Sequence, residues 1–147
     1  MEIKKHAIQL QSIQFYESSF KINKELRDDT EPIEPKFSIA TGYEFLEDKN
    51  VIYVGIRIKT DEDKTARYSL FVEMVGIFNV NESFSKEYIP HWAQNNGFYI
   101  LLPFIRQHVY SLTASLASVP YIIPLMEIPK LNTQGADTKA EIDYNNL

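Results

Sequence analysis

The stretch 37–74 constrains the fold most strongly, because apolar and polar residues alternate through three successive segments. One parity is apolar in residues 37–45, in 52–58 and again in 68–74. Strict alternation is typical of strands with one buried and one exposed face, as in antiparallel sheets. The connections EDKN and TDEDKT are short and polar. The three segments are therefore predicted to form an antiparallel meander.

A further strand and a crossover are predicted before the meander. Residues 7–22 also alternate, but their apolar positions change parity after Leu10 and again after Phe15. A bulge or bend at such a change would return all of them to one face. Residues 23–35 are polar and contain two prolines, so they are predicted to connect without a strand of their own.

One long helical pattern follows in residues 96–120, where apolar residues recur at three- and four-residue steps. Pro103 is tolerated in a first turn, where its missing N–H has no partner to lose. The helix is therefore predicted from about Pro103 to Ala117, whereas a helix starting near Asn96 would be kinked at this proline. The aromatic-rich segment before it is predicted to hold a short helix or turn, cut at Pro90.

Length and composition indicate one domain of the α+β class. A chain of 147 residues buries about 70% of its unfolded surface. We expect the domain to span residues 1–130. The apolar residues 121–131 are interrupted by prolines and are predicted to be extended. The polar residues 131–147 are predicted to be a disordered tail.

Several classes of protein are not expected. The absence of cysteine excludes disulfides, thiolate nucleophiles and cysteine zinc sites. No secretory leader pattern is present, so a cytoplasmic location is expected. No run reaches the ~18 apolar residues of a membrane span, so no membrane insertion is expected. A net charge of −5 argues against binding nucleic acid.

No catalytic constellation is recognisable. His6, His91 and His108 are far apart and lack ligand partners at metal spacing. The acidic run at 61–63 lies in a predicted hairpin turn, and the glycines form no phosphate loop. No serine lies in a nucleophile elbow. We therefore expect neither an enzyme nor a cofactor. The many aromatic residues outside the inward strand positions either complete the core, form an oligomer interface or line a hydrophobic binding groove.

Three motifs are similar to motifs of one known protein family. ILLPFIR at 100–106 is similar to the start of the family's main helix, and VPYIIP at 119–124 is similar to the segment that follows it. VEMVGIF at 72–78 is similar to the end of the family's fourth strand. The order of predicted elements also agrees over residues 7–130. On these motifs and this order, the chain resembles the SecB family of export chaperones. The resemblance implies a four-stranded antiparallel sheet with a kinked first strand and a crossover, packed with one long C-terminal helix.

The resemblance also implies a function. Family members are ATP-independent holdases that assemble as homotetramers, as dimers of dimers. They bind unfolded preproteins or other non-native polypeptides in apolar grooves. In protein export they pass these clients to the SecA motor. Some relatives instead guard an antitoxin in a toxin–antitoxin module, which is the alternative expected for this chain. A small-molecule or lipid binder with the same apolar pocket is a further alternative.

Three sets of site residues follow from the resemblance and from the distribution of aromatic residues. A peptide-binding groove is predicted to be lined by Phe78, Trp92, Phe98, Tyr99, Leu101, Tyr121, Ile123 and Leu125. A docking face for the export motor is predicted to include Glu17, Phe71 and Glu73. Subunit contacts are predicted at Phe104, His108, Leu112 and Leu116.

Overall fold

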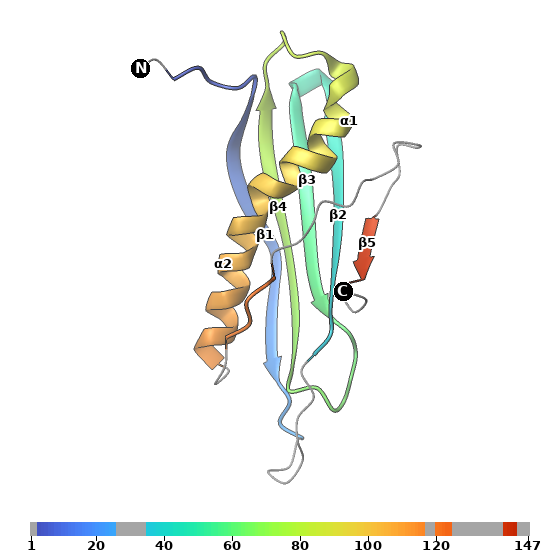
Figure 1. Ribbon diagram of the computed structural model, residues 1–147, viewed down its shortest axis with the longest axis vertical. Coiled ribbons are helices and arrows are strands. Elements are labelled where there is room, and N and C mark those ends of the chain that lie inside the picture. Colours follow the sequence, from blue (N-terminus) through green and yellow to red (C-terminus); the bar gives the residue numbers. More distant parts are fainter. Residues whose placement is uncertain (1–2, 26–34, 117–119, 125–139, 144–147) are drawn as a thin grey trace.

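The computed structural model describes residues 3–25, 35–116, 120–124 and 140–143. Its strands form one antiparallel sheet with the order β1-β4-β3-β2-β5 (Figure 1). They are β1 (Ile8–Ile22), β2 (Phe37–Leu46), β3 (Val51–Thr60), β4 (Tyr68–Val80) and β5 (Ala140–Asp143). The helices α1 (Ile89–Trp92) and α2 (Phe98–Leu116) cross one face of this sheet. The predicted α+β fold of a four-stranded sheet and one long helix is confirmed.

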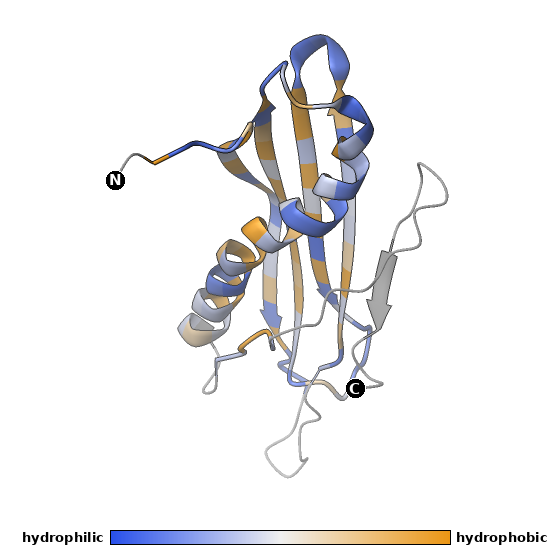
Figure 2. Cartoon of the chain, turned by 45° about the horizontal axis from the view of Figure 1, so that its top comes forward, coloured by the Kyte–Doolittle hydropathy of each residue, from blue (hydrophilic) through white to orange (hydrophobic). Residues whose placement is uncertain are grey.

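The meander follows the predicted alternation. Ile52, Val54, Ile56 and Ile58 of β3 are fully buried beneath the helices, whereas Arg57 is exposed on the opposite face. Figure 2 shows the resulting bands of hydrophobic and hydrophilic residues along the central strands. The predicted turn EDKN is a 3₁₀ turn followed by Asn50 in the left-handed conformation, with a φ of 50°. Asparagine tolerates this conformation better than most residues.

The two parity changes of the first strand correspond to two irregularities in its pairing with β4. The register shifts between Leu10 and Ser12 and again between Phe15 and Glu17. Each shift inserts one extra residue, which is how a bulge moves an apolar series to the other parity. Phe15 consequently faces α2 rather than the opposite side of the sheet. The predicted kink of the first strand is confirmed.

The predicted start of the long helix is wrong. α2 begins at Phe98, and a π-helical turn (Ala93–Gly97) joins it directly to α1. Pro90 lies at the start of α1 instead of cutting it, and Pro103 lies inside α2. Phe98 is buried against the sheet, and this burial outweighs the hydrogen bond that Pro103 does not donate. Pro103 itself faces solvent.

A short strand also occurs where the sequence indicates a polar tail. Residues 140–143 form β5, which pairs antiparallel with residues 38–41 of β2. The remainder of the predicted tail lies outside the described residues. Among the described helices, none has the length and apolar character needed to cross a membrane.

Glycine allows α2 to lie close to the sheet. A Cβ on Gly76 of β4 would lie 2.5 Å from Cδ2 of Leu101, and one on Gly97 would lie 2.9 Å from Cγ2 of Val54. Real Cβ atoms do not approach other atoms this closely. The side chain of Leu101 therefore occupies the space above the Gly76 backbone and is itself fully buried.

We expect Gly76→Ala to lower the free energy of unfolding by about 1–3 kcal/mol, because the new methyl group overpacks the contact with Leu101. Gly42→Ala is the matched control, since a Cβ there meets nothing within 4 Å. Its effect should stay within about 0.5 kcal/mol. Urea unfolding midpoints measure both changes. Equal midpoints for the two variants would contradict this account of the packing.

Candidate functional site

The predicted groove residues lie mainly in the interior layer between the sheet and the helices. Five of them are at most 5% exposed: Phe78, Trp92, Phe98, Leu101 and Ile123. Tyr99 and Tyr121 are half-buried at the border of this layer, and Leu125 lies outside the described residues. A groove lined by these side chains stays a prediction, and it requires part of the layer to open.

Aromatic rings meet edge to face in this layer. The ring centroids of Phe78 and Trp92 are 5.0 Å apart, and those of Phe98 and Tyr99 are 5.3 Å apart. The hydroxyl of Tyr99 and the Oε1 atom of Gln94 are buried without a hydrogen-bond partner among the described residues. Burial raises the pKa of Tyr99. The layer is therefore predominantly apolar, with few polar groups to orient a bound small molecule.

The segment Pro120–Pro124, called the strap below, lies against α2 through main-chain contacts. Arg106 donates from Nε to the carbonyl oxygen of Ile123 at 3.0 Å and from Nη2 to that of Pro124 at 3.2 Å. Thr113 Oγ1 accepts the N–H of Tyr121 at 2.7 Å and donates to the carbonyl oxygen of Val109 at 2.9 Å. Thr113 is fully buried, so this pairing satisfies its hydroxyl.

Alternate side chains of the strap face the protein. The ring of Tyr121 stacks on Phe37 of β2, with centroids 4.0 Å apart and planes 12° apart. Ile123 is buried in the core, whereas Ile122 between them is 65% exposed. This alternation is typical of an extended chain. The strap therefore joins α2 to the edge of the meander, and burial raises the pKa of Tyr121.

The three residues of the predicted motor-docking face come together on the sheet face opposite the helices. Glu17 of β1 lies directly across from Glu73 of β4. Glu73 forms an ion pair with Arg57 of β3 at 2.8 Å. The guanidinium of Arg57 lies 5.8 Å from the centroid of the Phe71 ring. Arg57 thus partly neutralises the acidic pair, which the sequence alone did not indicate.

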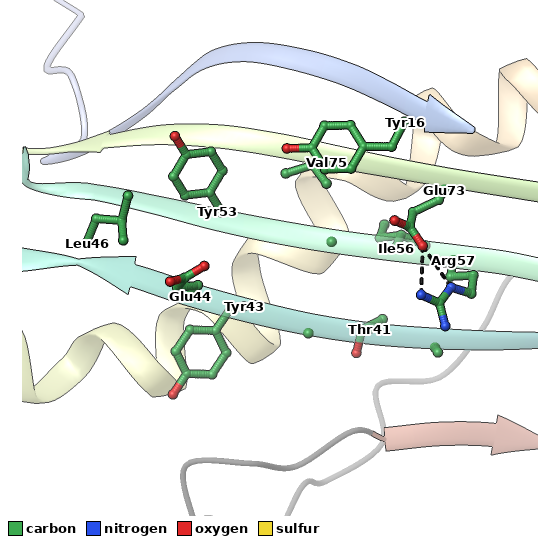
Figure 3. A pocket seen from close by; sticks show the side chains of 13 residues that line it. Tyr16, Thr41, Tyr43, Glu44, Leu46, Tyr53, Ile56, Arg57, Glu73 and Val75 are labelled. Atoms are coloured by element: carbon green, nitrogen blue, oxygen red, sulfur yellow. Dashed lines mark hydrogen bonds and ion pairs between the residues drawn. The ribbon is translucent and has the colours of Figure 1, made fainter. Parts of the chain in front are cut away.

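A hollow of about 570 Å³ lies beside this ion pair, on the same face (Figure 3). Gly42 of β2 and Gly55 of β3 lie opposite each other in the register and leave its floor without side chains. Tyr16 and Tyr53 contribute to its walls. The sequence analysis missed this hollow because two scattered glycines become neighbours only through strand pairing.

The predicted subunit-contact residues follow one another at four-residue steps along α2 but differ in their exposure. Phe104 is exposed, whereas Leu112 is half-buried against the core. His108 is half-buried, stacks on Phe15 with centroids 4.1 Å apart, and has its Nε2 2.9 Å from Ser18 Oγ. The side chain of Leu116 is outside the described part of the structure. Subunit contacts through these residues stay a prediction.

A larger apolar surface is exposed along β1 and α2. Five large side chains there are between 40% and 47% exposed: Phe15, Ile22, Ile100, Phe104 and Tyr110. The contact between Phe15 and His108 links the strand to the helix.

In the described part of the chain, no group of three or more His, Asp or Glu side chains could hold a metal ion.

Burial lowers the pKa of His108 below its ordinary value near 6.5. The folded state therefore favours neutral imidazole, and below about pH 6.5 the unfolded state takes up the proton first. We expect the unfolding free energy of the wild type to fall relative to that of His108→Gln between pH 7 and pH 5. Urea unfolding at several pH values measures this difference, and a pH-independent difference would contradict it.

Comparison with known proteins supports the fold. No family model and no curated protein matches the sequence. Among solved structures, the chain is similar to a SecB-like chaperone from Mycobacterium tuberculosis, in complex with a ChAD peptide from the HigA1 antitoxin. The TM-score is 0.66 at 16% identity, covering 82% of this chain and 91% of that one. A Streptococcus agalactiae protein of unknown function matches with a TM-score of 0.44 at 10% identity, covering 80% of this chain and 97% of that one. The resemblance inferred from the motifs is thus supported by structure: the chain has a SecB-like fold.

Proposed function

We propose that this protein is a chaperone that holds non-native polypeptides without ATP. The observation that carries the proposal is the exposed apolar surface along β1 and α2, where five large side chains remain at least 40% open to solvent. Large apolar side chains left open to solvent on a folded chain mark a candidate surface for protein interaction. On a SecB-like fold, unfolded chains and further copies of the same chain are the partners that this surface fits.

Apolar contact explains how such a surface selects non-native proteins. A folded client buries its apolar residues, whereas an unfolded client exposes them along an extended chain. Each Å² of apolar area removed from water contributes about 25 cal/mol before the cost of ordering both partners. Several such surfaces on one oligomer add avidity to weak contacts. Neither hydrolysis of a nucleotide nor any other catalytic step is needed.

The finer proposal is a cytoplasmic homotetramer that passes unfolded preproteins to SecA for export. It is supported by the resemblance in the three motifs and by the grouping of Glu17, Phe71 and Glu73 on the open sheet face. Acidic side chains on a flat face attract a basic partner. Arg57 pairs with Glu73, so Glu17 is the acidic side chain of this cluster that has no ion pair in the described structure.

A dedicated chaperone of an antitoxin is the second candidate. The Mycobacterium tuberculosis SecB-like chaperone with the same fold was determined in complex with a peptide from an antitoxin. This observation favours a protein that holds one specific client. Such a protein would bind its client tightly and leave generic unfolded proteins free to aggregate.

A light-scattering experiment tests the general holdase. We expect the protein to suppress aggregation of a chemically unfolded model enzyme diluted into buffer without nucleotide. The oligomer should do so at a concentration close to that of the unfolded enzyme. Size-exclusion chromatography of the same sample establishes the mass of the oligomer and that the protein is folded. Undiminished aggregation in the presence of folded protein would refute the general holdase and leave the dedicated chaperone.

A pair of variants tests the surface. Phe104→Ser should weaken client binding about fivefold, corresponding to about 1 kcal/mol of lost apolar contact. Tyr88→Ser removes an aromatic ring that is more exposed, at 59% against 47% for Phe104, but lies outside the surface, and it should leave binding unchanged. Titration of a labelled unfolded client measures both affinities. An unchanged affinity combined with a smaller oligomer would instead assign Phe104 to a subunit interface.

A further inference from the structure

We infer that Phe37, Arg106 and Thr113 form a cradle for an extended peptide, and that the strap is a built-in occupant which an incoming client displaces. This inference rests on the proposed function, in which the client is a non-native polypeptide. The ligand class is an extended polypeptide with an aromatic residue and an aliphatic residue two positions later.

The hydrogen bonds of the cradle are made only to main-chain atoms of the segment bound in it. Arg106 donates to the carbonyl oxygens of Ile123 and Pro124, at 3.0 and 3.2 Å. Thr113 accepts the amide of Tyr121 at 2.7 Å. Every polypeptide carries these carbonyl and amide groups, so the same three hydrogen bonds are available to a client of any sequence.

Apolar contacts supply the preference for a pattern. Phe37 offers its ring face to Tyr121, at a centroid distance of 4.0 Å. Ile123 is buried in the core, whereas Ile122 faces solvent. Any residue type is therefore accepted at the middle position. An aromatic residue, any residue and an aliphatic residue in succession meet these conditions. Such triplets are common in the interior strands of folded proteins and are exposed when those proteins unfold.

The strap is held weakly enough to leave. None of the hydrogen bonds between main-chain groups outside helices and strands in the described chain involves it. Its attachment is instead three hydrogen bonds to two side chains, one ring stack and one buried isoleucine. Segments with few such contacts open more readily than the sheet. Opening would also uncover the ring face of Phe37 and the part of the core that Ile123 fills.

An internal occupant lowers the apparent affinity for any competitor. The cradle binds a client only in the fraction of molecules whose strap is open, so weakening the strap should tighten client binding. Tyr121→Ser removes the ring stack without altering the three cradle residues. Ile122→Ser is the matched control, because that side chain lies in the same strap and faces solvent.

The test is a fluorescence anisotropy titration with a labelled peptide that carries the strap sequence PYIIP between Gly-Ser flanks. We expect Tyr121→Ser to bind the peptide about tenfold tighter than the wild type, and Ile122→Ser to match the wild type. Adding Arg106→Gln to Tyr121→Ser should reverse the gain. A control peptide, PSISP, should bind none of them. Equal affinity of wild type and Tyr121→Ser, or a gain that survives Arg106→Gln, would overturn the cradle.

Hydrogen exchange of the wild-type protein provides a measurement that needs no variant. Excess PYIIP peptide should accelerate exchange of the Tyr121 amide at least about threefold. The reason is that an amide of the peptide replaces the Tyr121 amide in the hydrogen bond to Thr113 Oγ1. Exchange that does not change at saturating peptide would refute displacement.

Aggregation assays on the same proteins separate this inference from the proposed function. Peptide binding with the expected pattern, but without suppression of aggregation by any variant, would uphold the cradle and refute the general holdase. Suppression of aggregation without the expected pattern of peptide affinities would uphold the holdase and refute the cradle.

Discussion

The structure depends on the close approach of α2 to the sheet, which glycine permits. Gly76 leaves room for Leu101, and Gly97 leaves room for Val54, so the helix lies directly on the strands at both points. This close packing excludes water from the interior layer, and a π-helical turn joins α1 to α2 without a break. It also sets the path of α2, which brings Arg106 and Thr113 against the strap.

The helices divide the molecule into two chemically different faces. Beneath the helices, the sheet is apolar and its side chains are buried to exclude water. On the opposite face, charged side chains, an aromatic-walled hollow and the Arg57–Glu73 ion pair remain open. In the proposed function, apolar contact on one side and electrostatic contact on the other would allow a client and a second protein to bind without competing for the same surface.

Residue patterns predicted the elements well wherever a single local rule applied. The alternation around Ile52 and Ile58 places the meander strands correctly, and the parity changes near Leu10 and Phe15 correspond to shifts in register. The start of α2 was predicted wrongly at Pro103, because a local rule on proline did not account for burial farther upstream. The aromatic residues of the predicted groove were recognised as a group, but not as members of the interior layer.

The sequence by itself determined the α+β class, the faces of the strands and the motifs that resemble SecB, because periodicity and spacing are local properties of the chain. Only the tertiary structure decided which apolar residues are buried and which remain open. Strand register brings Gly42 beside Gly55, and helix packing brings Thr113 to the amide of Tyr121. Such contacts join residues whose proximity depends on the whole arrangement of sheet and helix, so no local pattern encodes them.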